Sequence, residues 1–140
     1  MNLIHDTELS LFTEVPEDKE LNILYDLNQQ NTPEVGELES INDLSKLIDM
    51  SAINFYVLAG DEIIGFVICF REGSEYKSPN YTYFKNKEGK FLYIDRVVIK
   101  DAYRRRGAGS YLYDHLHELA KKEGIPLCCE VNIMPKNKIS

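Results

Sequence analysis

The feature that most constrains the fold is a strand that leads through a short basic loop into a helix and then into another strand. Residues Phe91–Ile99 are rich in β-branched and aromatic side chains and predict a buried strand. Apolar residues recur at helical spacing within Gly109–Glu123, which predicts an amphipathic helix that Gly124 ends as a C-cap. Leu127–Ile133 is a second apolar run. We therefore expect a parallel, right-handed strand–helix–strand crossover.

The remaining sequence predicts antiparallel strands and further helices around this crossover. Alternating apolar residues predict a strand near the start of the chain, and a turn-forming Gly60-Asp61 pair joins two apolar runs into a β-hairpin. A segment of about 20 residues, Arg71–Lys90, is polar and turn-rich apart from its tyrosines, and we expect a loop there. The expected elements are strand 9–15, helix 16–31, helix Ile41–Met50, and the hairpin strands Asn54–Ala59 and Glu62–Phe70. The predicted fold class is α/β (α+β), with a mixed, largely antiparallel twisted sheet flanked by helices.

The bulk properties indicate one soluble domain over residues 1–140. A net charge of −7 argues against general nucleic-acid binding, for which a basic surface is expected. No apolar run approaches the roughly 18 residues that a membrane-spanning helix requires, so no membrane partner is expected. The N-terminus lacks the layout of a signal peptide, and three cysteines are an odd count. We expect reduced thiols and a cytoplasmic location.

The basic loop carries the clearest chemical signal. Arg104, Arg105 and Arg106 are followed by Gly107-Ala108-Gly109-Ser110, where the helix is predicted to begin. The first amides of a helix lack internal partners, and the helix dipole makes that end positive. Glycines allow an anion to approach the backbone closely, and guanidinium groups match phosphate oxygens in geometry. The loop therefore predicts a site for a diphosphate, although glycines can also serve a turn and arginines are often only solvated.

The pattern Arg104-x-x-Gly107-x-Gly109 after Val97-Val98-Ile99 resembles the acyl-CoA signature of the GNAT N-acetyltransferase superfamily, and the hairpin, the helix and the last strand follow the same order. The resemblance implies the GNAT fold, acetyl-CoA as co-substrate, and a primary amine of unknown identity as acceptor, which attacks the thioester directly. A backbone N–H near Val97 would stabilise the oxyanion. The resemblance further implies that these residues bind the cofactor: Val97, Val98 and Ile99 along the pantetheine arm beside a bulge, the amides of Arg104, Arg105, Arg106, Gly107, Ala108, Gly109 and Ser110 at the pyrophosphate, and Asn132 and Asn137 at its border.

The proton acceptor is predicted among buried carboxylates, because a raised pKa would let such a group deprotonate the amine. Asp95 lies two residues before Val97, and strand alternation predicts that the two share a face. Glu130 on the following strand is the second candidate. Either carboxylate is as readily explained as a structural partner of Arg96 or Arg104. No metal site is predicted, because His115 and His117 do not share one helix face.

One departure from the family pattern concerns the end of the chain. GNAT domains continue after this last strand with a helix and a hairpin, which often supply a tyrosine that protonates the leaving thiolate. This sequence ends at Ser140, so we expect the domain to lack that helix and hairpin, and the uncovered sheet edge to be a surface for homodimerisation or aggregation. A non-catalytic CoA-binding module or an inactive truncated form is therefore the alternative function. The tyrosines of Tyr76–Phe84 are consistent both with an acceptor-pocket wall and with simple packing onto the sheet.

Overall fold

The structure is a computed structural model of the 140-residue chain and describes residues 9–12, 16–32 and 35–129. It contains five strands and five helices over these ranges. In chain order they are β1 (Leu9–Phe12), α2 (Asp18–Gln30), α3 (Ile41–Met50), β2 (Ile53–Ala59), β3 (Glu62–Arg71), α4 (Pro79–Lys87), β4 (Leu92–Ile99), α5 (Asp101–Arg104), α6 (Ala108–Glu123) and β5 (Leu127–Cys129).

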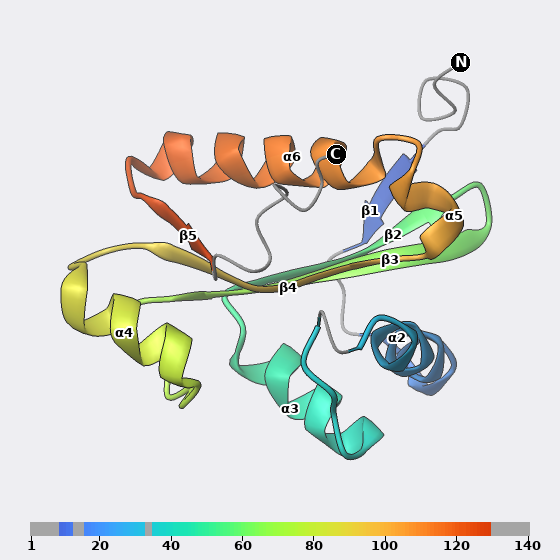
Figure 1. The fold of residues 1–140 in the computed structure, drawn as a ribbon, viewed down its shortest axis with the longest axis horizontal. Helices are drawn as coiled ribbons and strands as arrows, with labels where there is room; N and C mark the ends of the chain where they lie inside the picture. The colour runs from blue at the N-terminus through green and yellow to red at the C-terminus, as the bar shows by residue number, and fades with distance from the viewer. Residues whose placement is uncertain (1–8, 13–15, 33–34, 130–140) are drawn as a thin grey trace.

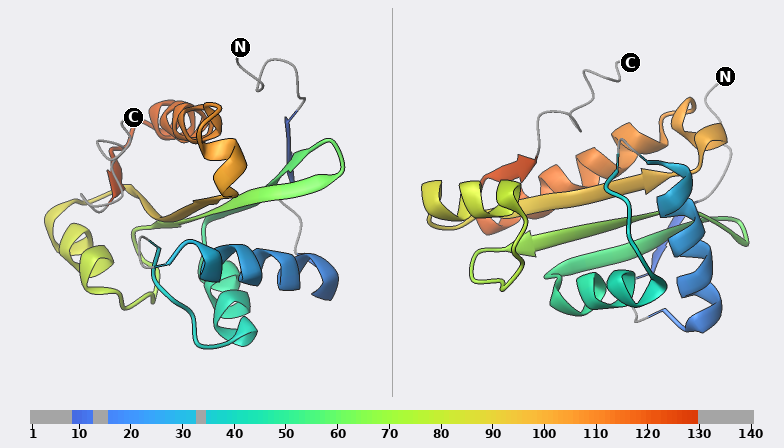
Figure 2. Two further views of the ribbon diagram at one scale, coloured as in Figure 1. Left: turned by 45° about the vertical axis from the view of Figure 1, so that its right-hand side comes forward. Right: turned by 60° about the horizontal axis from the view of Figure 1, so that its bottom comes forward.

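The strands form one mixed sheet in the order β1-β2-β3-β4-β5, which confirms the predicted fold class. The first four strands are antiparallel neighbours, and β5 is parallel to β4 because α5 and α6 carry the chain back across the sheet. Helix α6 covers one face, whereas α2, α3 and α4 lie on the other (Figures 1 and 2). Each face buries its own hydrophobic cluster, so the molecule has three layers around a central sheet.

The predicted hairpin is confirmed, with β2 and β3 joined at Gly60-Asp61. Its second strand approaches β4 very closely at Gly65. A Cβ atom on Gly65 would lie 2.4 Å from the carbonyl oxygen of Val98, so only glycine fits there without a backbone shift. The described part of the predicted last strand, Leu127–Cys129, is also a strand, and its continuation falls outside the described residues.

The prediction of a loop over Arg71–Lys90 was wrong for its second half, where α4 forms. Ser78 is the N-cap and accepts a hydrogen bond from the amide of Tyr81, and Pro79 occupies the first turn. The helix is short, and its only buried residue is Tyr81, whose hydroxyl donates to the Arg71 carbonyl at 2.6 Å. Tyr81, together with the partly buried Phe84, packs α4 against the sheet, so the presence of Tyr81 is explained by packing. No helix in the described ranges is long and apolar enough to cross a bilayer.

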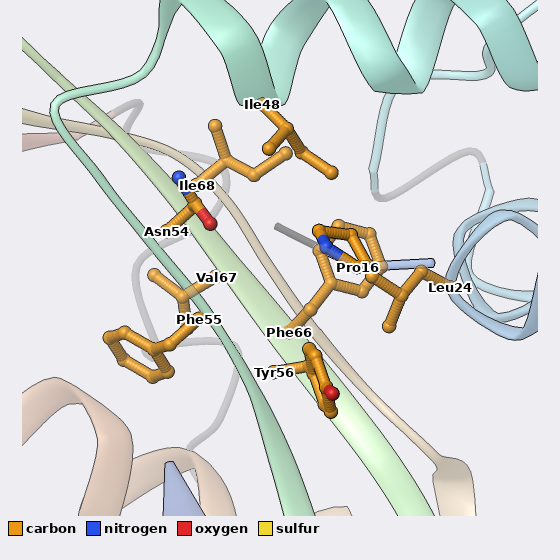
Figure 3. A pocket seen from close by; sticks show the side chains of 9 residues that line it. All are labelled: Pro16, Leu24, Ile48, Asn54, Phe55, Tyr56, Phe66, Val67 and Ile68. Atoms are coloured by element: carbon orange, nitrogen blue, oxygen red, sulfur yellow. The ribbon is translucent and has the colours of Figure 1, made fainter. Parts of the chain in front are cut away.

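Two hollows lie on the α2–α3 face of the sheet. A cavity of about 10 Å³ lies where Leu24, Ile48 and Pro16 gather over Phe66 and Ile68 (Figure 3), which is room for about one water molecule. A cleft of about 480 Å³ opens between α2 and the β2–β3 hairpin and reaches Lys100 at the end of β4. The first hollow is too small for a substrate.

Candidate active site

The start of α6 presents a row of backbone amides with no internal partner. Gly107 is the N-cap, with a left-handed backbone at φ 89°, and no side chain caps this end. The first amide of the helix that is satisfied internally is that of Tyr111, which donates to the Gly107 carbonyl at 3.0 Å. The amides of residues 107–110 donate to no group among the described residues. They therefore form the positive, anion-accepting end of a 16-residue helix.

The arginine amides do not extend this row as predicted. A short helix, α5, was not foreseen, and its turn uses these amides: that of Arg104 donates to the Lys100 carbonyl at 3.2 Å, and that of Arg106 to the Tyr103 carbonyl at 3.2 Å. The amide of Arg105 also points to the Tyr103 carbonyl. The unsatisfied amides thus begin at Gly107 rather than at Arg104.

The three arginine side chains are nevertheless exposed beside the helix start. The guanidinium of Arg104 donates to Asp101 Oδ1 at 2.6 Å, and that of Arg106 lies over the Tyr103 ring, 5.7 Å from its centroid. Arg105 makes no side-chain contact with another described residue that would neutralise its charge. A cationic rim therefore surrounds the row of amides in a protein of net charge −7.

The helix start lies directly over the end of β4. A Cβ atom on Gly109 would lie 3.7 Å from Cδ1 of Ile99, and Ala108 is buried. An anion held by the amides of residues 107–110 therefore sits next to the last residues of β4.

The backbone of β4 offers free hydrogen-bonding groups on the side away from β3. The Lys100 amide donates to the Ile64 carbonyl at 2.7 Å, which makes 64 and 100 a hydrogen-bonded pair. Hydrogen-bonded and non-hydrogen-bonded pairs alternate along an antiparallel ladder. Val98, which opposes Phe66, is therefore in a hydrogen-bonded pair. Ile99, which opposes Gly65, and Val97, which opposes Val67, are in non-hydrogen-bonded pairs. It follows that Val97 and Ile99 point their N–H and C=O groups towards the β5 side. The prediction for Val98 was wrong, because its backbone groups serve β3.

A β-bulge interrupts β4 at Asp95. The register with β3 pairs Ile68 with Arg96 but Cys69 with Ile94, so Asp95 is the extra residue. The last described parallel pair of β4 with β5 joins Ile94 to Cys129. The bulge therefore lies one residue beyond the last described pair of β4 and β5, and the bulge expected in this strand is present.

The bulge also reverses the predicted direction of the Asp95 side chain. Val97 packs in the cluster beneath α6, whereas Asp95 bonds to Tyr76, which packs in the opposite cluster. The prediction that Asp95 and Val97 share a face was wrong, because the extra residue breaks the two-residue alternation. Asp95 and Arg96 instead lie on the α2–α3 face together.

Asp95 is part of a buried polar network. Its Oδ2 accepts a hydrogen bond from Nε of Arg96 at 2.7 Å, and its Oδ1 accepts one from the Tyr76 hydroxyl at 2.6 Å. Nη1 of Arg96 in turn donates to Asn28 Oδ1 at 2.7 Å and to the Gly36 carbonyl at 3.1 Å. The interpretation of Asp95 as a partner of Arg96 is thus met by the geometry, while Arg104 bonds to Asp101 instead.

The structure adds site residues that the sequence alone did not reveal. Tyr76, Asn28 and Gly36 lie on separate segments and meet at the Asp95–Arg96 pair. The one local signal was Asn28, a polar residue on the face of α2 that also carries Leu24 and Leu27, and it is fully buried. The predicted residues Glu130, Asn132 and Asn137 lie outside the described residues. Within the described ranges no three His, Cys, Asp or Glu residues form a metal-binding group.

Comparison with known proteins agrees with this geometry. Residues 20–140 match the model of the acetyltransferase (GNAT) family. No curated protein sequence matches the chain. A protein from Clostridium difficile 630 described as a possible acetyltransferase is 18% identical, with a TM-score of 0.61, over 88% of this chain and 79% of that one.

Two further solved structures share the fold. The aminoglycoside N-acetyltransferase AAC(6')-Iy, in complex with CoA, is 13% identical with a TM-score of 0.62, over 95% of this chain and 82% of that one. A ribosomal-protein-alanine N-acetyltransferase from Brucella melitensis biovar Abortus 2308 is 16% identical, with a TM-score of 0.61. The match covers 94% of this chain and 84% of that one. At these identities the likeness establishes the fold, and the family model establishes the class. The chain belongs to the acetyltransferase (GNAT) family.

Proposed function

We propose that this protein transfers an acetyl group from acetyl-CoA to a primary amine. The observation that carries the proposal is the alignment of two sets of backbone groups: the unsatisfied amides of residues 107–110, and the outward-facing groups of Val97 and Ile99 beside them. The first set suits a pyrophosphate, and the second suits an extended amide-containing arm that pairs like a strand. CoA contains a pyrophosphate followed directly by an extended, amide-containing pantetheine arm. The similar aminoglycoside acetyltransferase AAC(6')-Iy was solved with CoA and with a CoA-based bisubstrate analogue, which supports this ligand.

In the proposed complex the pyrophosphate accepts hydrogen bonds from the amides of Gly107, Ala108, Gly109 and Ser110, and the exposed guanidinium groups of Arg104, Arg105 and Arg106 neutralise its charge. The pantetheine amides pair with Val97 and Ile99. Asn132 and Asn137 would border the cofactor, as the family pattern implies. This direction of the arm brings the thioester towards the bulge at Asp95, one residue beyond the last described pair of β4 with β5.

The proposed reaction is a direct attack by the amine. The nitrogen lone pair forms a bond to the thioester carbonyl carbon, and the oxygen takes up negative charge that the outward-facing N–H of Val97 stabilises. Collapse of this intermediate breaks the C–S bond and releases the CoA thiolate. The proton that the nitrogen loses needs an acceptor near the bulge, for which Asp95 is the described candidate and Glu130 the second.

Isothermal titration of the folded protein with acetyl-CoA tests the binding step, and the expected result is saturable binding at one site per chain. Gly109→Phe is the matched variant, because a Cβ atom at this position makes only ordinary contact with Ile99, while a bulky ring would block the space in front of the amides. We expect it to weaken the binding. Absence of saturable binding by the wild-type protein would refute the proposal.

A second assay tests the transfer step by detecting the free thiol of CoA in the presence of a panel of primary amines. Amine-dependent thiol release is expected. Saturable binding with no thiol release from any amine would favour the alternative, a non-catalytic CoA-binding module.

A further inference from the structure

The carboxylate of Asp95 is buried and cannot meet a substrate directly. Its side chain is only 6% exposed, and each of its oxygens already accepts a hydrogen bond, Oδ2 from Arg96 and Oδ1 from Tyr76. It nevertheless lies one residue beyond Ile94, where the described pairing of β4 with β5 ends. A proton acceptor at this point therefore needs a group that connects it to the substrate.

Arg96 cannot be that group. Its side chain is 7% exposed and is held by Asn28 Oδ1 and the Gly36 carbonyl in addition to Asp95. A guanidinium has no lone pair with which to accept a proton. Its role is to fix the Asp95 carboxylate in one orientation.

Tyr76 has the properties of a connecting group. It is only half-buried, and its ring stacks on Phe70 with 4.2 Å between centroids and 13° between planes, which fixes the hydroxyl direction. Burial, with the neighbouring Asp95 as second cause, raises the pKa of Tyr76 above its usual range, so the phenol keeps its proton and donates it to Asp95. A phenol oxygen that donates still has lone pairs to accept a hydrogen bond from another donor.

We propose that Tyr76 is a catalytic residue that relays the proton of the acceptor amine to Asp95. The proposal rests on the proposed acetyl transfer. As the nitrogen attacks, its N–H bond breaks and an O–H bond forms at the Tyr76 oxygen. The original Tyr76 O–H bond breaks, and that proton forms an O–H bond at Asp95 Oδ1, 2.6 Å away. The CoA thiolate leaves with the electron pair of the C–S bond, and the proton on Asp95 returns to solvent by the reverse path.

The relay also defines the side from which the amine approaches. Tyr76 belongs to the connection between β3 and α4, which lies on the same side of the sheet as α2 and α3 (Figure 1). The proposed pyrophosphate site belongs to α6 on the other side. The relay therefore places the amine on the Tyr76 side of the sheet and the cofactor on the α6 side.

The test compares Tyr76→Phe, which keeps the stacked ring and removes the hydroxyl, with Tyr83→Phe on exposed α4, where a tyrosine has no such contact with Asp95. We expect Tyr76→Phe to lower kcat by about a hundredfold, the usual contribution of a positioned acid–base group, with the KM for acetyl-CoA unchanged. Tyr83→Phe should retain wild-type kcat. Circular dichroism and denaturant unfolding of each variant show whether it is folded.

A double-mutant cycle separates a relay from a structural contact. Asp95→Asn keeps a side chain of the same shape that cannot accept the proton, and the double variant Tyr76→Phe/Asp95→Asn should be no slower than either single variant, because relay members act as a unit. Additive losses, or a Tyr76→Phe kcat within about twofold of wild type, would overturn the relay while leaving the acetyl transfer in place. A wild-type protein that releases no thiol would overturn both.

Discussion

At the scale of single residues, Gly107 determines the geometry of the proposed cofactor site. Its φ of 89° lies in the left-handed region, where an L side chain costs about 1–2 kcal/mol. We predict that Gly107→Ala lowers the free energy of unfolding by roughly this amount. It should also weaken acetyl-CoA binding, because relief of the strain turns the following amides away from a common point. Urea denaturation and titration calorimetry measure the two effects.

The control for this prediction is Gly89→Ala. Gly89 has no positive φ, and no atom lies within 4 Å of the position that an alanine methyl group would take there. That variant should change stability by less than about 0.5 kcal/mol. An unchanged affinity and stability of Gly107→Ala would show that the helix start does not depend on this backbone conformation.

Arg96 supports a second prediction at this scale, because it is the charged partner of a buried carboxylate. Arg96→Met leaves Asp95 without its ion pair, and the loss of one partner of a buried pair costs about 3–5 kcal/mol. The exposed pair Arg104–Asp101 is the matched control, and Arg104→Met should cost at most about 1 kcal/mol. Chemical denaturation of both variants makes the comparison. Equal losses would contradict the assignment of Arg96 as the buried anchor.

The sequence revealed these residues to very different degrees. The arginine and glycine residues of the loop were recognisable because the signal is local: a basic run, two glycines and a helix follow one another. The surroundings of Asp95 were not predictable, since no residue type in β4 marks the extra residue of a bulge. Its network depends on Asn28, which is 68 positions from Arg96 in the chain. Such contacts are set by tertiary packing rather than by local pattern.

At the scale of elements, the connection that contains α4 is closed at its base by Glu72. Its carboxylate accepts hydrogen bonds from Nε and Nη2 of Arg71 at 3.0 and 2.9 Å, and from the Phe91 amide at 3.0 Å. Arg71 ends β3 and Phe91 precedes β4. Glu72 therefore bonds to both ends of the connection that contains α4. The Arg71 guanidinium, as the largest cause, lowers the pKa of Glu72 to about 2.

This pKa predicts a loss of stability in acid. The folded-state pKa of Glu72 lies below its unfolded value of about 4.3, so its contribution is complete above that value and is lost as the pH falls from there towards about 2. Urea denaturation at a series of pH values should show a shallower decline for Glu72→Gln than for wild type. Glu75→Gln, an exposed glutamate of the same connection, is the control and should follow wild type. Identical slopes for wild type and Glu72→Gln would contradict the prediction.

The elements themselves were largely predictable, and the exceptions have physical causes. The hairpin and the α6 crossover follow from hydrophobic periodicity, because many residues of each contact the core. Helix α4 buries a single residue, so it carries almost no periodic signal. The cap of Ser78-Pro79, together with Lys85 and Lys87 in the last turn, was the available evidence for it. Helices that bury a single residue are better found from their caps than from their periodicity.

At the scale of the whole molecule, the charge distribution separates a local cationic site from an acidic surface. The net charge is −7, yet the proposed ligand is an anion that must approach the α5–α6 loop. The negative net charge repels the anionic cofactor at long range, whereas the loop arginines attract it locally. For binding to occur, the attraction by the loop must exceed the repulsion when the cofactor is in contact. Of the three loop arginines, Arg104 pairs with Asp101 and Arg106 packs on Tyr103, which leaves Arg105 as the most available charge.

This balance gives a prediction that distinguishes local from global electrostatics. Arg105→Gln and Lys46→Gln both change the net charge from −7 to −8, but Lys46 is an exposed residue of α3 on the opposite face of the sheet. We expect Arg105→Gln to weaken acetyl-CoA binding by roughly two- to fivefold, the range of an exposed ion pair, and to reduce the dependence of the affinity on salt. Lys46→Gln should leave both nearly unchanged. Titration calorimetry at about 0.05 and 0.5 M NaCl measures them, and an equal effect of the two variants would mean that net charge, rather than the loop at the start of α6, governs the attraction of the anion.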